Sequence, residues 1–482
     1  MQLALSPISM LNWSSRFQMD SREIMVTFLQ AILMGCLSWI VAKYTYNVYF
    51  HALREFPGPA FAAASYIPWF YHRARGNSRH WHKQLHERYG DVVRTGPAFL
   101  SFTHPQAWTD IYRHRGSAHR TYGKDWRFYT KPRRAGEYNI NTIPTDEQHG
   151  KVRRVFASAF SDRALKLQEP LISRHIDKVI YSITQHITQR PADAINIVQI
   201  YNYMAFDIMS DLAFGQGTGM LDGGHPSPWL EMVYRYVKAT NLLARLARGR
   251  EEPDIWNLID TSGEGLLTKG QIHANAAVFM SAGTETIATQ LSGVTYLLLS
   301  HPAKLRKLAQ EIRSFDNVED LSLQQLATLP YLNACLKEGL RLYPPIAEGL
   351  PRRIPDTGGA VLGHALQPGT SIYVSPYATN RSSTNFHRPD SFEPERWLSR
   401  ERHNEDRREA LQPFSTGPRD CLGKSLAYHE MRLAVARVIY YFDLKLQDSG
   451  QDWIAKQKTY VIWEKLPLWL QVSAVPRVDQ SR

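Results

Sequence analysis

The amino-acid sequence predicts a mainly α-helical fold with a small β portion and one N-terminal transmembrane helix. The helical prediction rests on long segments with apolar residues at helical spacing. The β portion is predicted from short alternating stretches among the many prolines between Pro351 and Pro418. The transmembrane helix is predicted from residues 25–42, which are almost continuously apolar. With 43% hydrophobic and 21% charged residues, the rest of the chain has the composition of a globular protein.

Residues 25–42 approach the length of about 20 residues that a helix needs to span a bilayer. They begin too deep in the chain for a secretory signal and lack a small-residue cleavage site, so we expect an uncleaved anchor. A buried core helix is the alternative for this segment. The residues after Lys43 include aromatic side chains of the kind found at a membrane interface, namely Tyr44, Tyr46, Tyr49 and Phe50.

The anchor divides the chain into four expected parts. Residues 1–24 form a short tail, residues 25–42 the anchor, residues 43–59 a linker, and residues 60–482 one large domain. The linker ends in a hinge, Phe56-Pro57-Gly58-Pro59, because two prolines fix φ and disfavour helix in the residues before them.

Within the large domain, extended stretches are predicted at residues 91–94, 99–102 and 370–375. A nearly continuous apolar segment with several small residues, 269–300, predicts a long helix through the core. Pro302 is expected to open the next helix, since proline is tolerated in a first helical turn. The other helices are predicted at residues 163–189, 195–214 and 331–342.

Charge and cysteine content restrict the class of protein. The net charge is +12, but no long Lys/Arg run and no zinc-finger or RNA-binding signature accompanies it, so no nucleic-acid partner is expected. A basic surface also suits an anionic membrane or an acidic protein, and dispersed solvated charge is the alternative. Cys36, Cys335 and Cys421 are odd in number and far apart, which suits a reducing compartment rather than a disulfide framework.

The strongest functional signal is the segment Phe414-Ser415-Thr416-Gly417-Pro418-Arg419-Asp420-Cys421-Leu422-Gly423-Lys424. Gly417 permits a tight turn. Cys421 precedes a helix expected to begin near Leu422, where backbone N–H groups and the helix dipole stabilise a thiolate. Such a thiolate can ligate haem iron. A cysteine without this context is more often a small buried hydrophobe.

This segment resembles the F-x-x-G-x-R-x-C-x-G haem loop of the cytochrome P-450 family at every fixed position. The resemblance covers nearly the whole chain from Phe56 onward and implies the P-450 fold, a triangular prism-like helical domain. It implies haem b with Cys421 as the axial iron ligand. It further implies that Phe414 shields the sulfur, that Gly423 lets the helix approach the porphyrin, and that Arg419 pairs with a propionate.

A second motif lies within the long helix: Ala282-Gly283-Thr284-Glu285-Thr286. It resembles the family's oxygen-activation motif, in which an alcohol beside a carboxylate relays protons into a dry pocket. The resemblance implies that Thr286 hydrogen-bonds bound dioxygen, that Glu285 supplies protons from water, and that Gly283, next to Ala282, gives the helix room to widen beside the haem. The alternative, given about equal weight, is that the Thr286 hydroxyl donates to the backbone carbonyl four residues earlier in its own helix. Ile287 replaces the second hydroxyl that is usual in the family.

Two further matches concern charged residues. Glu338 and Arg341 resemble the family's E-x-x-R helix, and Pro394-Glu395-Arg396-Trp397 resembles its P-E-R-F segment. Glu338, Arg341 and Arg396 are therefore expected to form a buried structural network under Cys421. His149 stands where the family's W-x-x-x-R helix has tryptophan, and Arg153 matches the arginine. We expect Arg153, His149 and Arg352 to be candidates for binding the haem propionates, with a surface position as the alternative for His149.

The resemblance is closest to fungal enzymes of the isotrichodermin hydroxylase type. It implies a monooxygenase that inserts one oxygen atom from O2 into an apolar small molecule, such as a terpenoid, polyketide or alkaloid of secondary metabolism. Electrons would come from NADPH through NADPH–cytochrome reductase, with cytochrome b5 as a second donor, at a surface carrying Lys151, Arg154, Lys424 and Arg432. The implied location is the endoplasmic reticulum membrane, with a single span, a cytosolic catalytic domain and a luminal glycosylation site at Asn12.

One departure leaves alternatives open. Between Trp229 and Ile272 the chain is shorter than in relatives of this type, where two helices roof the substrate pocket. The pocket is then unusually open, or the sequence derives from an imperfect gene model. The alternatives to a monooxygenase are a reductase-independent haem-thiolate isomerase or dehydratase, and an inactive haem-binding membrane protein.

Overall fold

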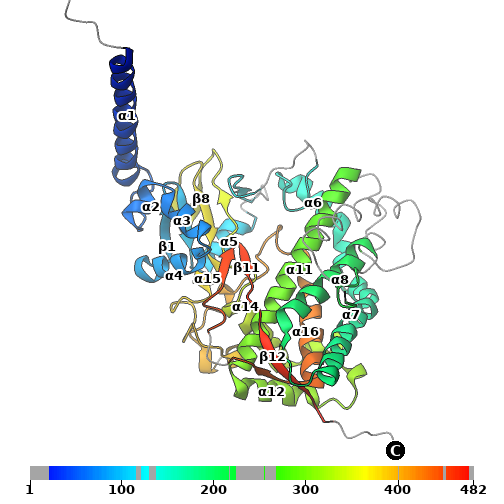
Figure 1. Ribbon diagram of the computed structural model, residues 1–482. Coiled ribbons are helices and arrows are strands. Elements are labelled where there is room, and N and C mark those ends of the chain that lie inside the picture. Colours follow the sequence, from blue (N-terminus) through cyan, green and yellow to red (C-terminus); the bar gives the residue numbers. More distant parts are fainter. Residues whose placement is uncertain are drawn as a thin grey trace, which may run out of the picture.

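The computed structural model describes residues 21–114, 121–129, 137–215, 218–223, 255, 267–399, 401–448 and 452–476. Figure 1 shows a helical body on one side, a smaller part with short strands on the other, and one helix that extends away from the strand side. The predicted mainly α fold with a small β portion is therefore confirmed.

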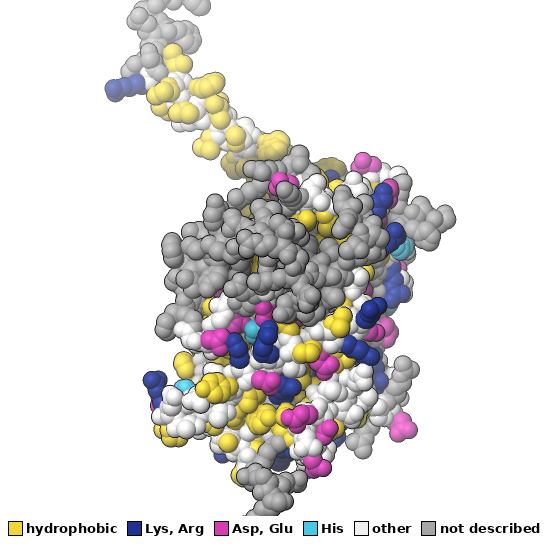
Figure 2. Space-filling view, turned by 90° about the vertical axis from the view of Figure 1, so that its right-hand side faces the viewer, with side chains coloured by type: hydrophobic (Ala, Val, Ile, Leu, Met, Phe, Trp, Pro, Cys, Tyr) yellow, Lys and Arg dark blue, Asp and Glu magenta, His cyan; other side chains and the backbone are white. Residues whose placement is uncertain are grey.

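The extended helix is α1, Ser21–Thr45, which continues into the π-helical turn Tyr46–Phe50. It contains the predicted anchor, and no residue of its most apolar 18-residue window is buried. Figure 2 shows hydrophobic side chains along its length. Its length and composition fit a membrane-spanning anchor. At its end, Asn47 is buried and donates a hydrogen bond from Nδ2 to the carbonyl of Ala64 at 2.8 Å, which fixes the turn against α2, Ala60–Ala64.

The proline hinge is held by the first strand of the body. The Arg94 N–H donates to the Pro57 carbonyl at 2.7 Å. A side chain at Gly58 would clash, because its Cβ would lie 2.4 Å from the Arg94 carbonyl oxygen. This close approach of two backbones is the reason that the hinge needs glycine between its two prolines.

The smaller part is built on a five-stranded sheet of order β1-β2-β8-β5-β3. β2 pairs with β8 in parallel and the other pairs are antiparallel. The β3–β5 pair matters for the site because its register places Lys124 opposite Arg352. The strands are β1 Val92–Gly96, β2 Phe99–Phe102, β3 Gly123–Lys124, β5 Arg352–Arg353 and β8 Ser371–Val374, and the helices beside them are α3 Ile67–Ala74, α4 Ser78–Tyr89, α5 Gln106–Tyr112 and α15 Pro376–Thr379.

The body surrounds one long helix, α11, Lys269–Leu299, which runs diagonally through it in Figure 1. Thr268 caps this helix reciprocally with Gln271, an arrangement that satisfies two free backbone N–H groups. Its buried neighbours belong to a single hydrophobic core. The helices are α6 Asp146–Ala157, α7 Asp162–Gln189, α8 Ile197–Phe214, α12 Pro302–Arg313, α13 Leu323–Thr328, α14 Pro330–Leu342 and α16 Lys424–Tyr441.

Small accessory strands complete the fold. The sheets are β4-β12-β9, the hairpin β10-β11 and the hairpin β6-β7. β4 takes the first two residues of the segment predicted as one helix at 195–214, so that helix begins at Ile197. The strands are β4 Ile195–Asn196, β6 Gly359–Val361, β7 His364–Leu366, β9 Phe442–Leu446, β10 Lys458–Tyr460, β11 Ile462–Glu464 and β12 Trp469–Ala474.

One buried carboxyl group is poorly accommodated by this core. Glu430 of α16 is 1% exposed, and its Oε2 has no hydrogen-bond partner in the part of the chain that the structure describes. Burial raises the pKa of Glu430 from 4.5 to about 8. Because folding favours the neutral form, the unfolded chain alone loses this proton between about pH 4.5 and pH 8, and the folded state loses stability over that interval.

We therefore expect Glu430→Gln, which cannot ionise, to gain thermal stability relative to the parent protein as the pH rises from 5 to 8. The gain should approach roughly 1 kcal/mol per pH unit. The measurement is the melting temperature of both proteins at pH 5 and pH 8, with Glu319→Gln, an exposed carboxyl group, as the control. If the difference in melting temperature between Glu430→Gln and the parent protein does not change with pH, the pKa of Glu430 is not raised in the folded state.

Candidate functional site

The loop around Cys421 is closed by its own backbone. The Cys421 N–H donates to the Phe414 carbonyl at 2.9 Å, and the Asp420 N–H donates to the Gly417 carbonyl at 3.1 Å. Gly417 has φ of +86°, and a Cβ there would lie 2.3 Å from the Tyr112 carbonyl oxygen. The loop is thus pressed against the end of α5, where only glycine fits.

The Cys421 side chain is accessible to solvent. Enough protein lies around the thiol, however, to weaken its solvation. α16 begins at Lys424, two residues after the predicted position, with Gly423 as its N-cap. Burial raises the pKa of Cys421, and the Gly423 N–H, Arg153 and Lys424 lower it without reversing the shift. The predicted effect of the helix terminus is present but weaker than desolvation. A metal cation that binds this thiol therefore has to displace its proton.

Part of the oxygen-activation motif, Ala282 with Glu285 and Thr286, lies on a face of α11 that is open although the helix runs through the core. Ala277, Ser281 and Ala282 are exposed on this face. Gly283 does not border it: a Cβ there would lie 2.3 Å from the Met209 sulfur, so this glycine allows α8 to approach α11. The space that the sequence assigned to the haem at Gly283 is occupied by Met209.

The Thr286 and Glu285 side chains, which the sequence predicts to form a proton relay, make hydrogen bonds with different partners. The Thr286 hydroxyl donates to the Ala282 carbonyl at 2.6 Å, which is the capping arrangement left open by the sequence. The Glu285 carboxylate accepts a hydrogen bond from Lys465 at 2.8 Å. Lys465 also lies 3.2 Å from the Thr289 hydroxyl. No motif in the sequence pointed to Lys465.

A cluster of cationic side chains gathers where α6, the Cys421 loop and the β3–β5 pair meet. Arg419 binds Asp146 at 2.8 Å and donates to the Ile143 carbonyl at 2.8 Å. Burial lowers the pKa of Arg419. Burial, then Arg352 and Arg419, lower the pKa of Lys124 to about 7. Positive charge therefore exceeds negative charge here. The sequence motifs did not include Lys124, because only the β3–β5 pairing brings it next to Arg352.

The remaining predicted propionate candidates are placed as follows. Arg352 is buried, and its Nε has no hydrogen-bond partner among the described residues. Arg153 binds Asp420 through both its carboxylate, at 2.6 Å, and its carbonyl, at 2.7 Å. His149 is buried, which overturns the surface alternative; burial, then Arg419 and Arg153, lower its pKa to about 3, so it is neutral.

These residues fit a haem. No group of three or more His, Cys, Asp or Glu side chains among the described residues could hold a metal ion. A porphyrin would supply four nitrogen ligands to an iron held by Cys421. The unpaired Arg352 Nε and the surplus of cations match the two propionates that a haem carries. Gly423 leaves space, since a Cβ there would meet nothing closer than Phe160 at 3.8 Å.

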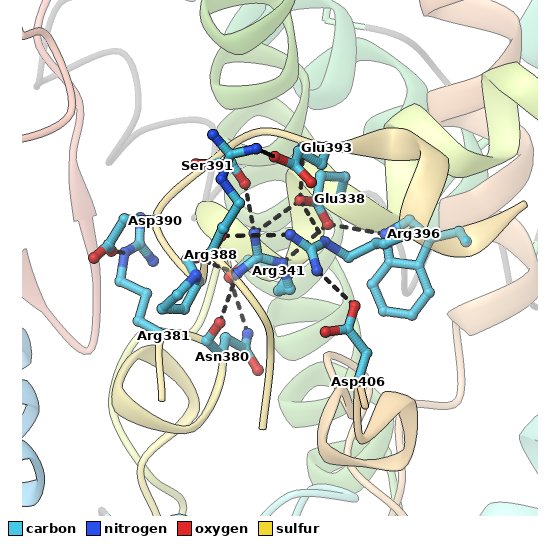
Figure 3. A network of polar contacts seen from close by, with 12 residues as sticks. Glu338, Arg341, Asn380, Arg381, Arg388, Asp390, Ser391, Glu393, Arg396 and Asp406 are labelled. Carbon is cyan, nitrogen blue, oxygen red and sulfur yellow. Dashed lines mark hydrogen bonds and ion pairs between the residues drawn. The ribbon is translucent and has the colours of Figure 1, made fainter. Parts of the chain in front are cut away.

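Behind the site lies a buried charge network centred on Glu338 (Figure 3). Glu338 binds Arg341 at 2.7 and 2.9 Å and Arg396 at 3.0 Å, and all three side chains are fully buried. It also accepts hydrogen bonds from the Trp397 indole and the Glu393 N–H. Burial raises the pKa of Glu338, but the two arginines outweigh burial and the net shift is downward.

The arginines in turn hold the coil that precedes Cys421. Arg341 donates to the carbonyls of Asn380, Pro389 and Ser391. Arg396 binds Asp406 at 2.6 Å. Further along, the Trp108 indole donates to the Ala410 carbonyl at 3.1 Å, and Arg113 donates to Thr416 at 2.9 Å. The network thus fixes a segment with little regular secondary structure, in agreement with the structural role that the sequence indicated.

A thiol at the head of a helix, near buried cations that can bind an anionic group, is the arrangement expected of a haem-thiolate protein. The chain belongs to the cytochrome P450 family, because the model of that family matches residues 56–247 and 254–472. It is 40% identical to cytochrome P450 monooxygenase FUM2 of Gibberella moniliformis over 88% of this chain and 98% of that protein. It is 37% identical to cytochrome P450 monooxygenase efuB of Hormonema carpetanum over 92% and 95%. It is 34% identical to averantin hydroxylase of Dothistroma septosporum over 95% and 93%.

Two expectations fall largely outside the described residues. Asn12 is one. The shortened segment between Trp229 and Ile272 is the other, since only Ile255 and residues 267–272 of it are described. The family match is interrupted in this segment at residues 248–253 and resumes at residue 254.

We expect Glu338→Gln to destabilise the protein by about 3–5 kcal/mol, because it leaves two buried guanidinium groups without their shared carboxylate. The coil before Cys421 should loosen, so haem should also be lost at a lower temperature than in the parent protein. Melting temperature and the temperature of haem release measure the two effects, with Glu319→Gln as the exposed control. Unchanged values for Glu338→Gln would contradict the structural role.

Proposed function

We propose that this protein is an NADPH-dependent haem-thiolate monooxygenase that hydroxylates an apolar small molecule in fungal secondary metabolism. The carboxylate and alcohol at Glu285 and Thr286, on the open face of α11, are the observation that carries the proposal. An enzyme that only rearranges its substrate needs no such pair for proton delivery. The relatives support the reaction class, since one of them is an averantin hydroxylase.

Haem with a thiolate ligand supplies the activation of dioxygen for insertion of one oxygen atom. The protein's own residues would hold and orient the group: Cys421 would bind the iron, and Arg352, Arg419 and Lys124 would lie near the propionates. Phe414 packs against Tyr428 with ring centroids 5.2 Å apart and shields one side of the loop. Glu285 takes a proton from solvent, and the Thr286 oxygen, whose own proton is engaged with Ala282, accepts and orients a hydrogen bond.

Electrons are proposed to enter from NADPH–cytochrome reductase, with cytochrome b5 as a second donor. Arg154 and Lys424 are exposed and can attract an acidic partner. Lys151 is also exposed, but it is paired with Glu147 at 2.8 Å, so it contributes less charge to this surface. Arg432 is half-buried and its guanidinium donates to Asn333 at 2.8 Å, so it contributes less to such a surface than the sequence indicated.

We propose an endoplasmic reticulum location, with a tail at residues 1–24, an anchor at 25–42, a linker at 43–59 and a cytosolic catalytic domain at 60–482. Apolar side chains beside the anchor support membrane contact by the domain itself: Phe61 is 83% exposed and Ile67, Phe70 and Tyr71 are also exposed. These residues lie on α2 and α3, next to α1 in Figure 1.

The cofactor is tested first. The purified, detergent-solubilised protein, reduced under carbon monoxide, should give the Soret band of a thiolate-ligated haem, and Cys421→Ser should lose it because the ligand is gone. Cys335→Ser, at a buried thiol elsewhere, is the matched control and should keep the band. A folded protein without haem would refute the proposal, and a haem protein that consumes no NADPH with reductase would favour the isomerase or inactive alternatives.

The orientation is tested by glycosylation. We expect Asn12 to be glycosylated in microsomes, with a mass shift that Asn12→Gln abolishes, because a cytosolic catalytic domain places the tail in the lumen. The second sequon, at Asn380, is uninformative in the folded chain, because Asn380 is buried and donates to the Arg341 carbonyl. If external protease digests an N-terminal tag in sealed microsomes, the tail lies on the cytosolic side and the proposed orientation is wrong.

A further inference from the structure

Lys465 is a buried cation on a segment far from the haem loop in sequence. Its side chain is 6% exposed, whereas that of its partner Glu285 is 42% exposed. Its ammonium group lies 2.8 Å from the Glu285 carboxylate and 3.2 Å from the Thr289 hydroxyl. A lysine is rarely buried to this degree unless it is paired, so the contact with Glu285 is a specific one.

The backbone on both sides of Lys465 is firmly held. The preceding strand, β11, is fixed by Trp463, whose indole donates to the Pro344 carbonyl at 2.7 Å and stacks on Tyr343 with ring centroids 4.0 Å apart. After Lys465, the Leu468 N–H donates to Asn196 at 3.2 Å and its carbonyl accepts from Ile197. Lys465 therefore presents its charge to α11 from a fixed point.

The pairing decides where the Glu285 carboxylate lies. Glu285 and Thr289 are four residues apart and share one face of α11, and Lys465 binds both. Thr286 is the next residue and is turned by about 100° around the helix axis. Lys465 thus holds the Glu285 carboxylate next to the Thr286 hydroxyl and not in direct contact with it. The other side of the carboxylate is in contact with solvent.

We propose that Lys465 is a positioning residue for Glu285: it holds the proton-supplying carboxylate in one orientation between solvent and the Thr286 side of the pocket. This inference rests on the proposed monooxygenase function and names a residue that the function did not require. Without the ammonium group, the carboxylate can turn into solvent, and protons reach the site of oxygen reduction less often.

Dioxygen alone can serve as the probe, so no substrate has to be known. With reductase, the protein can return two electrons to oxygen, NADPH + H⁺ + O2 → NADP⁺ + H2O2, or four, 2 NADPH + 2 H⁺ + O2 → 2 NADP⁺ + 2 H2O. Cleavage of the O–O bond needs protons delivered within the pocket. The share of consumed NADPH that appears as hydrogen peroxide therefore reports delivery through Glu285.

The experiment compares the parent protein with Lys465→Met, Lys465→Arg, Glu285→Gln and the double variant Lys465→Met/Glu285→Gln. Thr286→Ala is included as a variant that should itself raise the peroxide share. Lys445→Met, at an exposed lysine of β9, is the matched control. Each protein is first adjusted to equal haem by its carbon monoxide spectrum. Lys465→Gln replaces Lys465→Met if the latter does not fold.

We expect Lys465→Met to raise the peroxide share at least twofold, Lys465→Arg and Lys445→Met to stay near the parent value, and the double variant to be no worse than Glu285→Gln. A purely structural role for Lys465 would lower the melting temperature without this pattern. If Thr286→Ala raises the peroxide share and Lys465→Met does not, the inference is wrong while the proposed function stands. If Glu285→Gln leaves the share unchanged, Glu285 is not the proton source and the inference fails with it. If no variant and not even the parent protein oxidises NADPH, the proposed function itself fails.

Discussion

The shared carboxylate of Glu338 is the interaction on which the site most depends. Two guanidinium groups, those of Arg341 and Arg396, are fully buried against it, and desolvation of three charges is costly unless each is paired and hydrogen-bonded. The structure meets this condition by using the remaining donors of the arginines on carbonyls of residues 380–391 and on Asp406. A coil that lacks the backbone ladders of helix or sheet is thereby fixed from beneath, and the Cys421 loop inherits a defined position from it.

The two charged clusters of the protein differ in a way that separates structure from binding. Around Glu338, every guanidinium nitrogen of Arg341 and Arg396 donates to a protein oxygen, and the net shift of the Glu338 pKa is downward because its charge is well compensated. Around Arg352, Arg419 and Lys124, cations crowd together, and burial and like charge lower the pKa of Lys124 to about 7. One buried N–H of Arg352 finds no acceptor within the described ranges of the chain. A surplus of one charge inside a protein is expensive on its own, so an anionic ligand is the arrangement's natural complement.

The sequence was most informative where chemistry is local. The Cys421 motif, the long apolar helix α11 and the short strands beside the prolines all depend on neighbouring residues, and each lies close to its predicted position. Contacts made over long sequence distances were beyond it: Lys124 reaches Arg352 only through the β3–β5 register, and Lys465 reaches Glu285 across 180 residues. Gly283 shows the same limit in another form, because its small size could equally favour a cofactor or a helix, and only the position of Met209 decides.

The Glu338 network and the contact between Lys465 and Glu285 both depend on α14. Glu338 and Arg341 lie on this helix and hold the coil before Cys421, whereas Tyr343, at its C-cap, stacks on Trp463 and so fixes the strand that carries Lys465 to Glu285. The Cys421 loop and the Glu285 carboxylate on α11 are thus both positioned from the C-terminal end of one 13-residue helix. A rigid common support keeps two groups in register more reliably than separate loops, because the two groups cannot move independently of each other. The positions of Cys421 and Glu285 therefore depend on the packing of α14 as much as on the motifs that contain them.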